Sequence, residues 1–196
     1  MEALTGQLML DFGTSGGSQV REFRPRGIEP EHPKTLEAEL WFQRGLDLEE
    51  SGGEIKEVGE AYQRALELNP NAAGAWVNLG TLRYREDDLR EAERCYRGAL
   101  QASPEYALAH FNLGNICEEG GRLEEAAVHY DQALELNPVY ADAHYNLALV
   151  CERSGELMRA AKHWRAYLKI DQTSPWAGIA RQQLSCLMTV TRGGAS

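Results

Sequence analysis

The chain has 196 residues, of which 43% are hydrophobic, and it carries 20 basic against 30 acidic residues. The net charge of −10 and the pI near 5.0 argue against nucleic acid or an anionic membrane as the main partner, because phosphate groups need a basic surface. No apolar run is long enough to span a bilayer, and the N-terminus has no cationic signal region. The four cysteines include no close pair, so we expect reduced thiols and a cytoplasmic location. This length suffices for one domain or one repeat array without a disulfide or metal staple.

The first 34 residues differ in composition from the rest of the chain. The glycine and serine run at 15–18 and the prolines Pro25, Pro30 and Pro33 predict a flexible segment over residues 1–34. Within it, Gly6–Phe12 alternates only weakly between apolar and polar residues. A short strand, a docking peptide and the remnant of a removed domain remain open for that stretch.

From about residue 38 the sequence repeats with a period of 34. The segments Trp76–Gly80, His110–Gly114 and His144–Ala148 align with one another at this offset. The stretch Ala-Leu-Glu-Leu-Asn-Pro occurs at 65–70 and again, unchanged, at 133–138. A fixed period with small residues, aromatic residues and a closing proline indicates a repeat array.

Each repeat is expected to form two helices, because alanine and leucine recur at helical spacings in both of its halves. Glycines such as Gly121 and Gly155 fit the turn between the helices, and Pro70 and Pro138 follow the second helix. Small residues are expected to leave room for a neighbouring helix and the tyrosines and Trp164 to fill that room. The small positions are Gly80, Ala92, Gly114, Ala126, Ala148 and Ala160.

This pattern resembles the tetratricopeptide repeat (TPR) family over about residues 38–171, and we expect a bacterial source. The unit at 73–106 matches best, through Trp76, Leu79, Gly80, Ala92, Tyr96, Ala99 and Pro104. The resemblance implies an all-α solenoid of four helix-turn-helix repeats within residues 35–174. Their expected bounds are 38–72, 73–106, 107–140 and 141–174.

A capping helix is expected to follow the repeats over residues 175–191, with a disordered tail at 192–196. Ser174 is a good N-cap and Pro175 suits the first helical position. Trp176, Ile179 and the leucines that follow would cover the last repeat.

In the family, the first helices line a concave groove that binds peptides. Asn78, Asn112 and Asn146 occupy one position in three repeats, with Gln43 at that position in the first. A carboxamide both donates and accepts, so a row of them suits a peptide backbone and is similar to the asparagine row of O-GlcNAc transferases. The alternative is that these amides are structural. The predicted peptide-binding residues are Phe42, Gln43, Asn78, Phe111, Asn112, Asn115, Tyr145 and Asn146.

The aromatic members of this set are expected to be exposed anchors for a partner, an expectation that fails if they are buried between helices. Around them we count seven acidic against two basic groove residues, which favours a basic or apolar segment. Recognition of an acidic chaperone tail is disfavoured, because Val77, Phe111 and Tyr145 stand where the family's carboxylate binders use lysine or arginine.

No catalytic motif is present, so we expect no enzymatic activity, no cofactor and no metal. One alternative is a zinc site that bridges two repeats, formed by His110, Cys117, His144 and Cys151. It is the weaker reading, because these positions usually hold packed side chains and equivalent residues lie about 10 Å apart. Two further histidines, at 129 and 163, are expected on the surface.

The sequence therefore predicts a non-enzymatic scaffold that binds an extended peptide segment of another protein, as a monomer or weak homodimer. Three alternatives stay open. The cap or first repeat could pair two copies, the chain could be the TPR part of a MerR-like regulator, or Leu8–Phe12 could occupy the chain's own groove. The identity of the partner is not encoded in these patterns.

Overall fold

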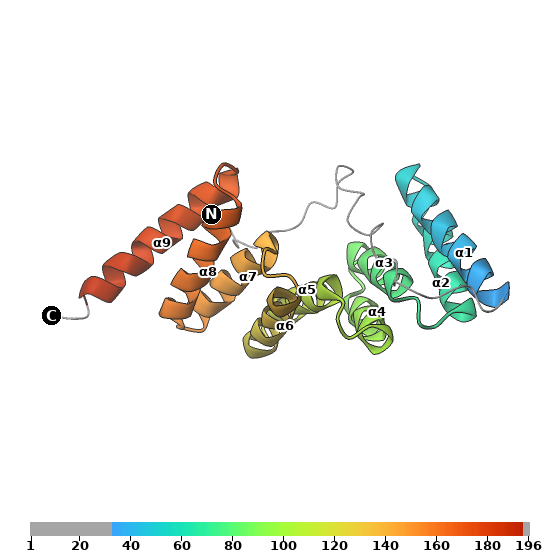
Figure 1. The fold of residues 1–196 in the computed structure, drawn as a ribbon, viewed down its shortest axis with the longest axis horizontal. Helices are drawn as coiled ribbons and strands as arrows, with labels where there is room; N and C mark the ends of the chain where they lie inside the picture. The colour runs from blue at the N-terminus through green and yellow to red at the C-terminus, as the bar shows by residue number, and fades with distance from the viewer. Residues whose placement is uncertain (1–32, 194–196) are drawn as a thin grey trace. The chain divides into compact units, whose positions relative to one another are not determined.

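A computed structural model of the chain describes residues 33–193, and this part consists of nine α-helices without strands (Figure 1). The predicted all-α repeat class is confirmed. The helices are α1 (Pro33–Glu50), α2 (Ile55–Leu68), α3 (Ala73–Arg85), α4 (Leu89–Ala102), α5 (Ala107–Glu119), α6 (Leu123–Leu136), α7 (Ala141–Arg153), α8 (Leu157–Ile170) and α9 (Pro175–Gly193). They fall into two compact units, an N-terminal unit that ends at Ala109 and a C-terminal unit that begins at His110.

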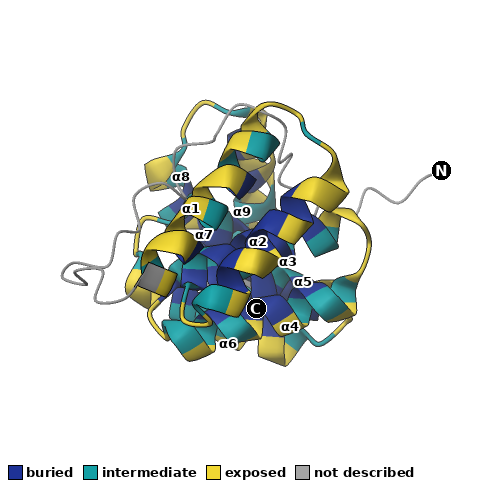
Figure 2. Ribbon diagram, turned by 90° about the vertical axis from the view of Figure 1, so that its right-hand side faces the viewer, coloured by how far each residue is buried: buried dark blue, intermediate teal, exposed yellow. Residues whose placement is uncertain are grey.

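Helices pair because each carries an apolar stripe. Figure 2 shows the buried residues along one side of most helices, with exposed residues on the other. In the N-terminal unit, Val58, Tyr62 and Leu66 of α2 and Leu79 of α3 belong to one buried cluster. Burial of such side chains stabilises each helix by about 1.5–3 kcal/mol per large residue.

Close helix packing depends on glycines that face tyrosines. A Cβ atom added to Gly80 would lie 2.7 Å from the Tyr96 ring, and one added to Gly114 would lie 2.5 Å from the Tyr130 ring. Both distances are shorter than any real carbon contact, so no larger residue fits without movement. The predicted role of these small residues is confirmed.

Three of the four turns inside helix pairs use a glycine with positive φ. Gly52, Gly121 and Gly155 have φ of 72°, 72° and 78°. The α3–α4 turn instead has Asp87 at φ 63°, a left-handed conformation that aspartate tolerates better than most residues.

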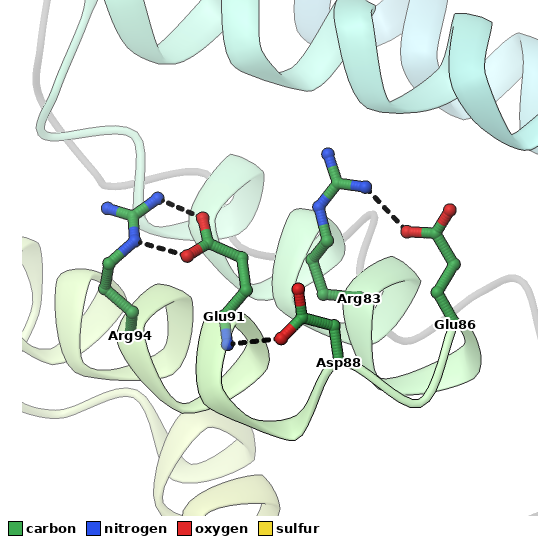
Figure 3. Close-up of polar contacts among 5 residues, drawn as sticks. All are labelled: Arg83, Glu86, Asp88, Glu91 and Arg94. Carbon is green, nitrogen blue, oxygen red and sulfur yellow. Dashed lines mark hydrogen bonds and ion pairs between the residues drawn. The ribbon is translucent and has the colours of Figure 1, made fainter.

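Local polar contacts hold the α3–α4 turn (Figure 3). Asp88 is the N-cap of α4, since its Oδ1 accepts from the Glu91 amide at 3.1 Å, and Glu91 in turn pairs with Arg94. On the α3 side, Arg83 Nη1 donates to Glu86 Oε2 at 2.6 Å. Capping of this kind contributes about 1 kcal/mol to a helix.

The last helix begins as predicted. The Ala177 amide donates to Ser174 Oγ at 3.2 Å, which confirms Ser174 as the N-cap of α9. Ala177 and Ala180 are completely buried. Two boundaries differ by two residues from the expected ones: α1 begins at Pro33 because proline suits the first helical turn, and α9 continues to Gly193.

Residues 1–32 lie outside the described part, and with them the predicted linker and the Leu8–Phe12 segment. Between residues 33 and 193, no helix is both long and apolar enough to cross a membrane.

Candidate functional site

The predicted peptide-binding residues lie on the first helices α1, α3, α5 and α7, at very different depths. Gln43 is exposed on α1, and its Nε2 donates to Asp47 Oδ1 at 2.7 Å. Phe42 beside it is half-buried, with its ring centroid 5.9 Å from that of Tyr62. The asparagines are deeper: Asn78, Asn112 and Asn146 are 6%, 3% and 3% exposed.

In the N-terminal unit, Asn78 belongs to a hydrogen-bonded group of four side chains. Its Nδ2 donates to the Tyr62 hydroxyl at 3.3 Å, and this hydroxyl donates to Glu49 Oε2 at 2.6 Å. Arg85 Nη1 then pairs with Glu49 Oε1 at 3.2 Å. We call Glu49, Tyr62, Asn78 and Arg85 the N-terminal clamp, because they tie the first helix pair to α3. Burial and the neighbouring Glu49 raise the pKa of Tyr62, so its hydroxyl stays protonated as a donor.

The C-terminal unit repeats this arrangement with one more amide. The Tyr130 hydroxyl lies 2.8 Å from Asn115 Oδ1 and 3.0 Å from Glu118 Oε2. Asn146 Nδ2 donates to Asn115 Oδ1 at 3.0 Å, and Arg153 Nη1 pairs with Glu118 Oε1 at 2.8 Å. These five residues are the C-terminal clamp, which ties α5 and α6 to α7.

Glu118 supplies the carboxyl group of this clamp and is deeply buried, with 3% of the residue exposed. Burial raises its pKa, while the hydrogen bond from Tyr130 and the charge of Arg153 act in the opposite direction. The carboxyl group therefore depends on these two partners to stay ionised.

Beyond the clamp, the first helices of the C-terminal unit carry polar atoms without partners. Asn115 Oδ1 accepts from Asn146 Nδ2 and lies within hydrogen-bond distance of the Tyr130 hydroxyl, and its Nδ2 has no hydrogen bond among the described residues. Within residues 33–193, Asn112 Nδ2, Tyr145 Oη and Asn146 Oδ1 are buried and also find no partner. Asn112 and Asn115 are one turn apart on α5, so they share a face.

The expectation of exposed aromatic anchors is wrong for two residues. Phe111 and Tyr145 are both 0% exposed. Phe111 packs against Tyr140, with ring centroids 4.9 Å apart, and Tyr145 packs edge-on against Trp164 and Trp176 at 4.8 and 5.8 Å. Aromatic residues directly before α7, on α8 and on α9 cover them, so they contribute to the core instead.

Two histidine pairs repeat at the 34-residue offset. His144 Nδ1 lies 3.0 Å from His163 Nδ1, and His110 Nδ1 lies 3.4 Å from His129 Nδ1. His144 Nε2 also contacts the Pro138 carbonyl at 3.1 Å, so it carries the proton and His163 Nδ1–H donates to His144. The expected surface position of His163 is wrong, because the residue is 6% exposed. Burial and His144 lower its pKa to about 4.

The histidine pairs argue against the zinc site, since His144 faces His163 and not a cysteine. Among residues 33–193, no group of three or more histidine, cysteine or acidic side chains is placed to hold a metal ion. Cys95, Cys117 and Cys151 are buried thiols, and Cys186 on α9 is exposed. Burial raises the pKa of Cys95 and Cys151 to about 11.

The sequence prediction considered the asparagines alone, so it did not include the clamp tyrosines and their acidic partners. A signal was present: Tyr62 and Tyr130, like Arg85 and Arg153, are separated by two repeat lengths. The glutamates are one residue further apart because the turn after α1 has an extra residue.

Two family models match the chain, one described as tetratricopeptide repeat over residues 77–131 and one as TPR repeat over residues 114–155. Among curated proteins, the human protein O-mannosyl-transferase TMTC1 is 35% identical over 57 residues, which are 29% of this chain. The chain spans only 6% of that protein's length.

Solved structures resemble the fold. The chain superposes on pilF of Pseudomonas aeruginosa with a TM-score of 0.67 and 22% identity, covering 83% of this chain and 72% of that one. YrrB, described as a TPR protein with an unusual peptide-binding site, gives a TM-score of 0.67 and 20% identity over 82% and 84% of the two chains. At these identities the likeness concerns the fold.

Proposed function

Because this chain belongs to the tetratricopeptide repeat family, we propose that α5 and α7 of its C-terminal unit bind an extended peptide segment of a partner protein. Repeats of this family form protein-interaction scaffolds and are typically non-catalytic. The proposal concerns the place and chemistry of binding. We also propose a cytoplasmic location and no enzymatic activity, on the sequence grounds given above.

The observation that carries the proposal is the set of unpartnered polar atoms on α5 and α7. Among the described residues, Asn112 Nδ2 is a buried donor and Asn146 Oδ1 a buried acceptor without a partner, and half-buried Asn115 offers its Nδ2 as a second donor. A buried polar atom without a partner is unfavourable by about 1–3 kcal/mol, so a ligand that completes these hydrogen bonds would recover that free energy. An extended peptide supplies carbonyl and amide groups in alternation, which matches donors and acceptors on one surface.

Charge supports a basic rather than an acidic segment. Asp142 at the start of α7 is half-buried and forms no ion pair with any described residue. Burial and the neighbouring Asp171 raise its pKa, which means that an approaching cation would stabilise the ionised carboxylate. YrrB gives independent support, since it shares the fold and is described as having a peptide-binding site.

In the N-terminal unit, we propose that exposed Gln43, half-buried Phe42 and Asn78 contribute less to peptide binding. Asn78 already donates to Tyr62, so it has less capacity for a ligand than Asn112. Phe111 and Tyr145 have no place in the proposed contact, because neighbouring aromatic side chains cover their rings.

The test selects peptides against the full chain from a random displayed library and measures their affinity by calorimetry. For the Asn112→Ala/Asn115→Ala variant we expect roughly tenfold weaker binding, since two hydrogen bonds of about 0.5–1.5 kcal/mol each are lost. The matched control, Gln63→Ala/Gln101→Ala, removes two amides from exposed positions on α2 and α4 and should bind as the native chain does.

Equal binding by both variants would refute the proposed surface, and selection of acidic peptides would refute the proposed charge preference. The molar mass of each variant in solution is measured alongside. A dimer that binds no peptide would favour the self-assembly alternative.

A further inference from the structure

The distribution of charge along the chain is strongly uneven. Residues 157–196 contain six of the 20 basic residues but only one acidic residue, Asp171, out of 30. Helix α8 has no acidic residue at all. A protein with a net charge of −10 therefore has one locally basic part.

Three of these cations form a row on the outside of α8. Lys162, Arg165 and Lys169 are all exposed, and their spacings of three and four residues place them on one face. Their Cα atoms span about 10 Å along the helix axis. We call these three residues the basic stripe. Exposed Met158 continues it by one turn toward the start of α8, with 71% of its surface accessible.

No ion pair engages the stripe within the described part of the chain, although the charge of Lys162 acts on nearby Asp131, which pairs with Arg159. Arg165 Nη2 contacts the Met188 sulfur of α9 at 3.1 Å, and no ion pair joins any of the three cations to a described carboxylate. The other two basic residues nearby are engaged. Arg159 pairs with Asp131 and Glu156, and Arg181 donates to a backbone carbonyl.

The preceding repeat shows that this stripe is not a requirement of the fold. At the positions 34 residues earlier, α6 has Val128, Asp131 and Glu135 in place of the three cations, and Glu124 in place of Met158. Helix α6 is the second helix of its repeat, as α8 is of the next one, so the two occupy equivalent positions in the array. Packing therefore does not demand positive charge on this face, and another use of the charge is needed.

We propose that the basic stripe of α8 binds an acidic segment of a partner protein, with carboxylates opposite the three cations and an apolar side chain against Met158. Charge complementarity identifies the chemistry of this partner. The number of cations favours a peptide over other anions: nucleic-acid binders typically neutralise six to ten phosphates, and lipid-binding clusters use about four to eight basic residues. This inference goes beyond the peptide site on α5 and α7 and uses different residues.

The test measures the fluorescence anisotropy of a labelled helical peptide rich in glutamate, with the glutamine version of the same peptide as reference. The full chain should bind the glutamate peptide at about 50 mM salt and lose most of the affinity at about 300 mM. The reversal Lys162→Glu/Arg165→Glu/Lys169→Glu should weaken binding at least roughly tenfold, because like charges then face one another.

A matched control changes the net charge by the same amount elsewhere. Lys56→Glu/Arg64→Glu/Arg97→Glu reverses three exposed cations on α2 and α4, and we expect its affinity for the peptide to stay within about twofold of the native value. The neutral variant Lys162→Gln/Arg165→Gln/Lys169→Gln keeps the test valid if the charge reversal unfolds the chain, as checked by circular dichroism.

Three outcomes would overturn the proposal: no binding of the glutamate peptide at low salt, equal loss in the control variant, or tighter binding of single-stranded DNA or phosphatidylserine vesicles through the stripe. The Asn112→Ala/Asn115→Ala variant is measured in the same assay and should bind the acidic peptide normally. Failure of the proposed α5–α7 site and failure of the stripe are thereby distinguishable.

Discussion

The N-terminal and C-terminal clamps use the same four residue types but differ in depth. The Glu49 side chain is 27% exposed, whereas the Glu118 side chain is 2% exposed. The units also differ at the position after the packing glycine, which is Leu46 beside Gly45 and Asn115 beside Gly114. In the C-terminal unit an amide takes part in the clamp and is itself oriented by it.

The comparison indicates that one repeat motif can serve two purposes. In the N-terminal unit the tyrosine and asparagine complete a structural tie between helix pairs. In the C-terminal unit the same tie also orients a donor without a partner, the Asn115 Nδ2 group.

The largest expected difference between the units is their response to acid. The described part of the N-terminal unit has no histidine, whereas the C-terminal unit has His163, with a pKa of about 4. Because an unfolded histidine titrates near pH 6.5, stability is present above that pH and is lost as pH falls toward 4, by about 3 kcal/mol in all. Amide hydrogen exchange at pH 7 and 4.5, corrected for intrinsic rates, should show this loss in the C-terminal unit.

The variant His163→Gln should flatten that pH dependence. Raised carboxyl pKa values such as that of Glu118 act in the opposite direction, since such groups gain a proton more easily when folded. A C-terminal unit equally protected at both pH values in the native chain would contradict the histidine argument.

A second pair of substitutions tests the packing of glycine against the clamp tyrosine, which both units share. Gly45→Ala and Gly114→Ala place a methyl group 2.4 and 2.5 Å from a clamp tyrosine, so each should destabilise the protein by about 2–3 kcal/mol in urea unfolding. Gly178→Ala on α9 is the control, because its Cβ meets no atom within 4 Å and should stabilise the helix by about 0.5 kcal/mol. A clear inequality between the two clamp variants would mean that the units pack differently around the tyrosine.

Removal of the clamp arginine should destabilise the C-terminal clamp more than the N-terminal clamp. Arg153→Met leaves a buried carboxylate without its cation and should lower the free energy of unfolding by about 2 kcal/mol. Arg85→Met affects a more exposed pair and should lower it by about 0.5 kcal/mol. If the cause is the unpaired charge, adding Glu118→Gln to Arg153→Met should recover part of the loss, and no recovery would exclude that cause.

The smallest effect concerns the turns. Asp87→Gly relieves a positive φ and should stabilise the protein by about 0.5–1 kcal/mol, measured as a higher urea midpoint. The reciprocal change Gly121→Asp in the C-terminal unit should destabilise by a similar amount. A null result for both would show that aspartate is unstrained in these turns.

Much of the fold could be predicted because each repeat position recurs. The period of 34, the glycines opposite tyrosines and the Ser174 cap are local or periodic features, and a sequence displays them directly. The helix bounds follow from the same periodicity with errors of a few residues.

The candidate site was less predictable, because its depth depends on residues distant in sequence. Burial of Tyr145 requires Trp176, which belongs to another helix. Engagement of Asn146 requires Tyr130 and Asn115, which a row of asparagines does not reveal. Burial of His163 arises from its pairing with His144 across two helices.

The unequal burial of the cysteines makes the native sequence suitable for single-site labelling. Three thiols are enclosed, two of them with pKa values of about 11, so at neutral pH a maleimide should react with Cys186 alone. A fluorophore introduced there would report from α9 without any cysteine being removed. The unmodified chain thus already contains the attachment point for a spectroscopic sensor of ligand capture.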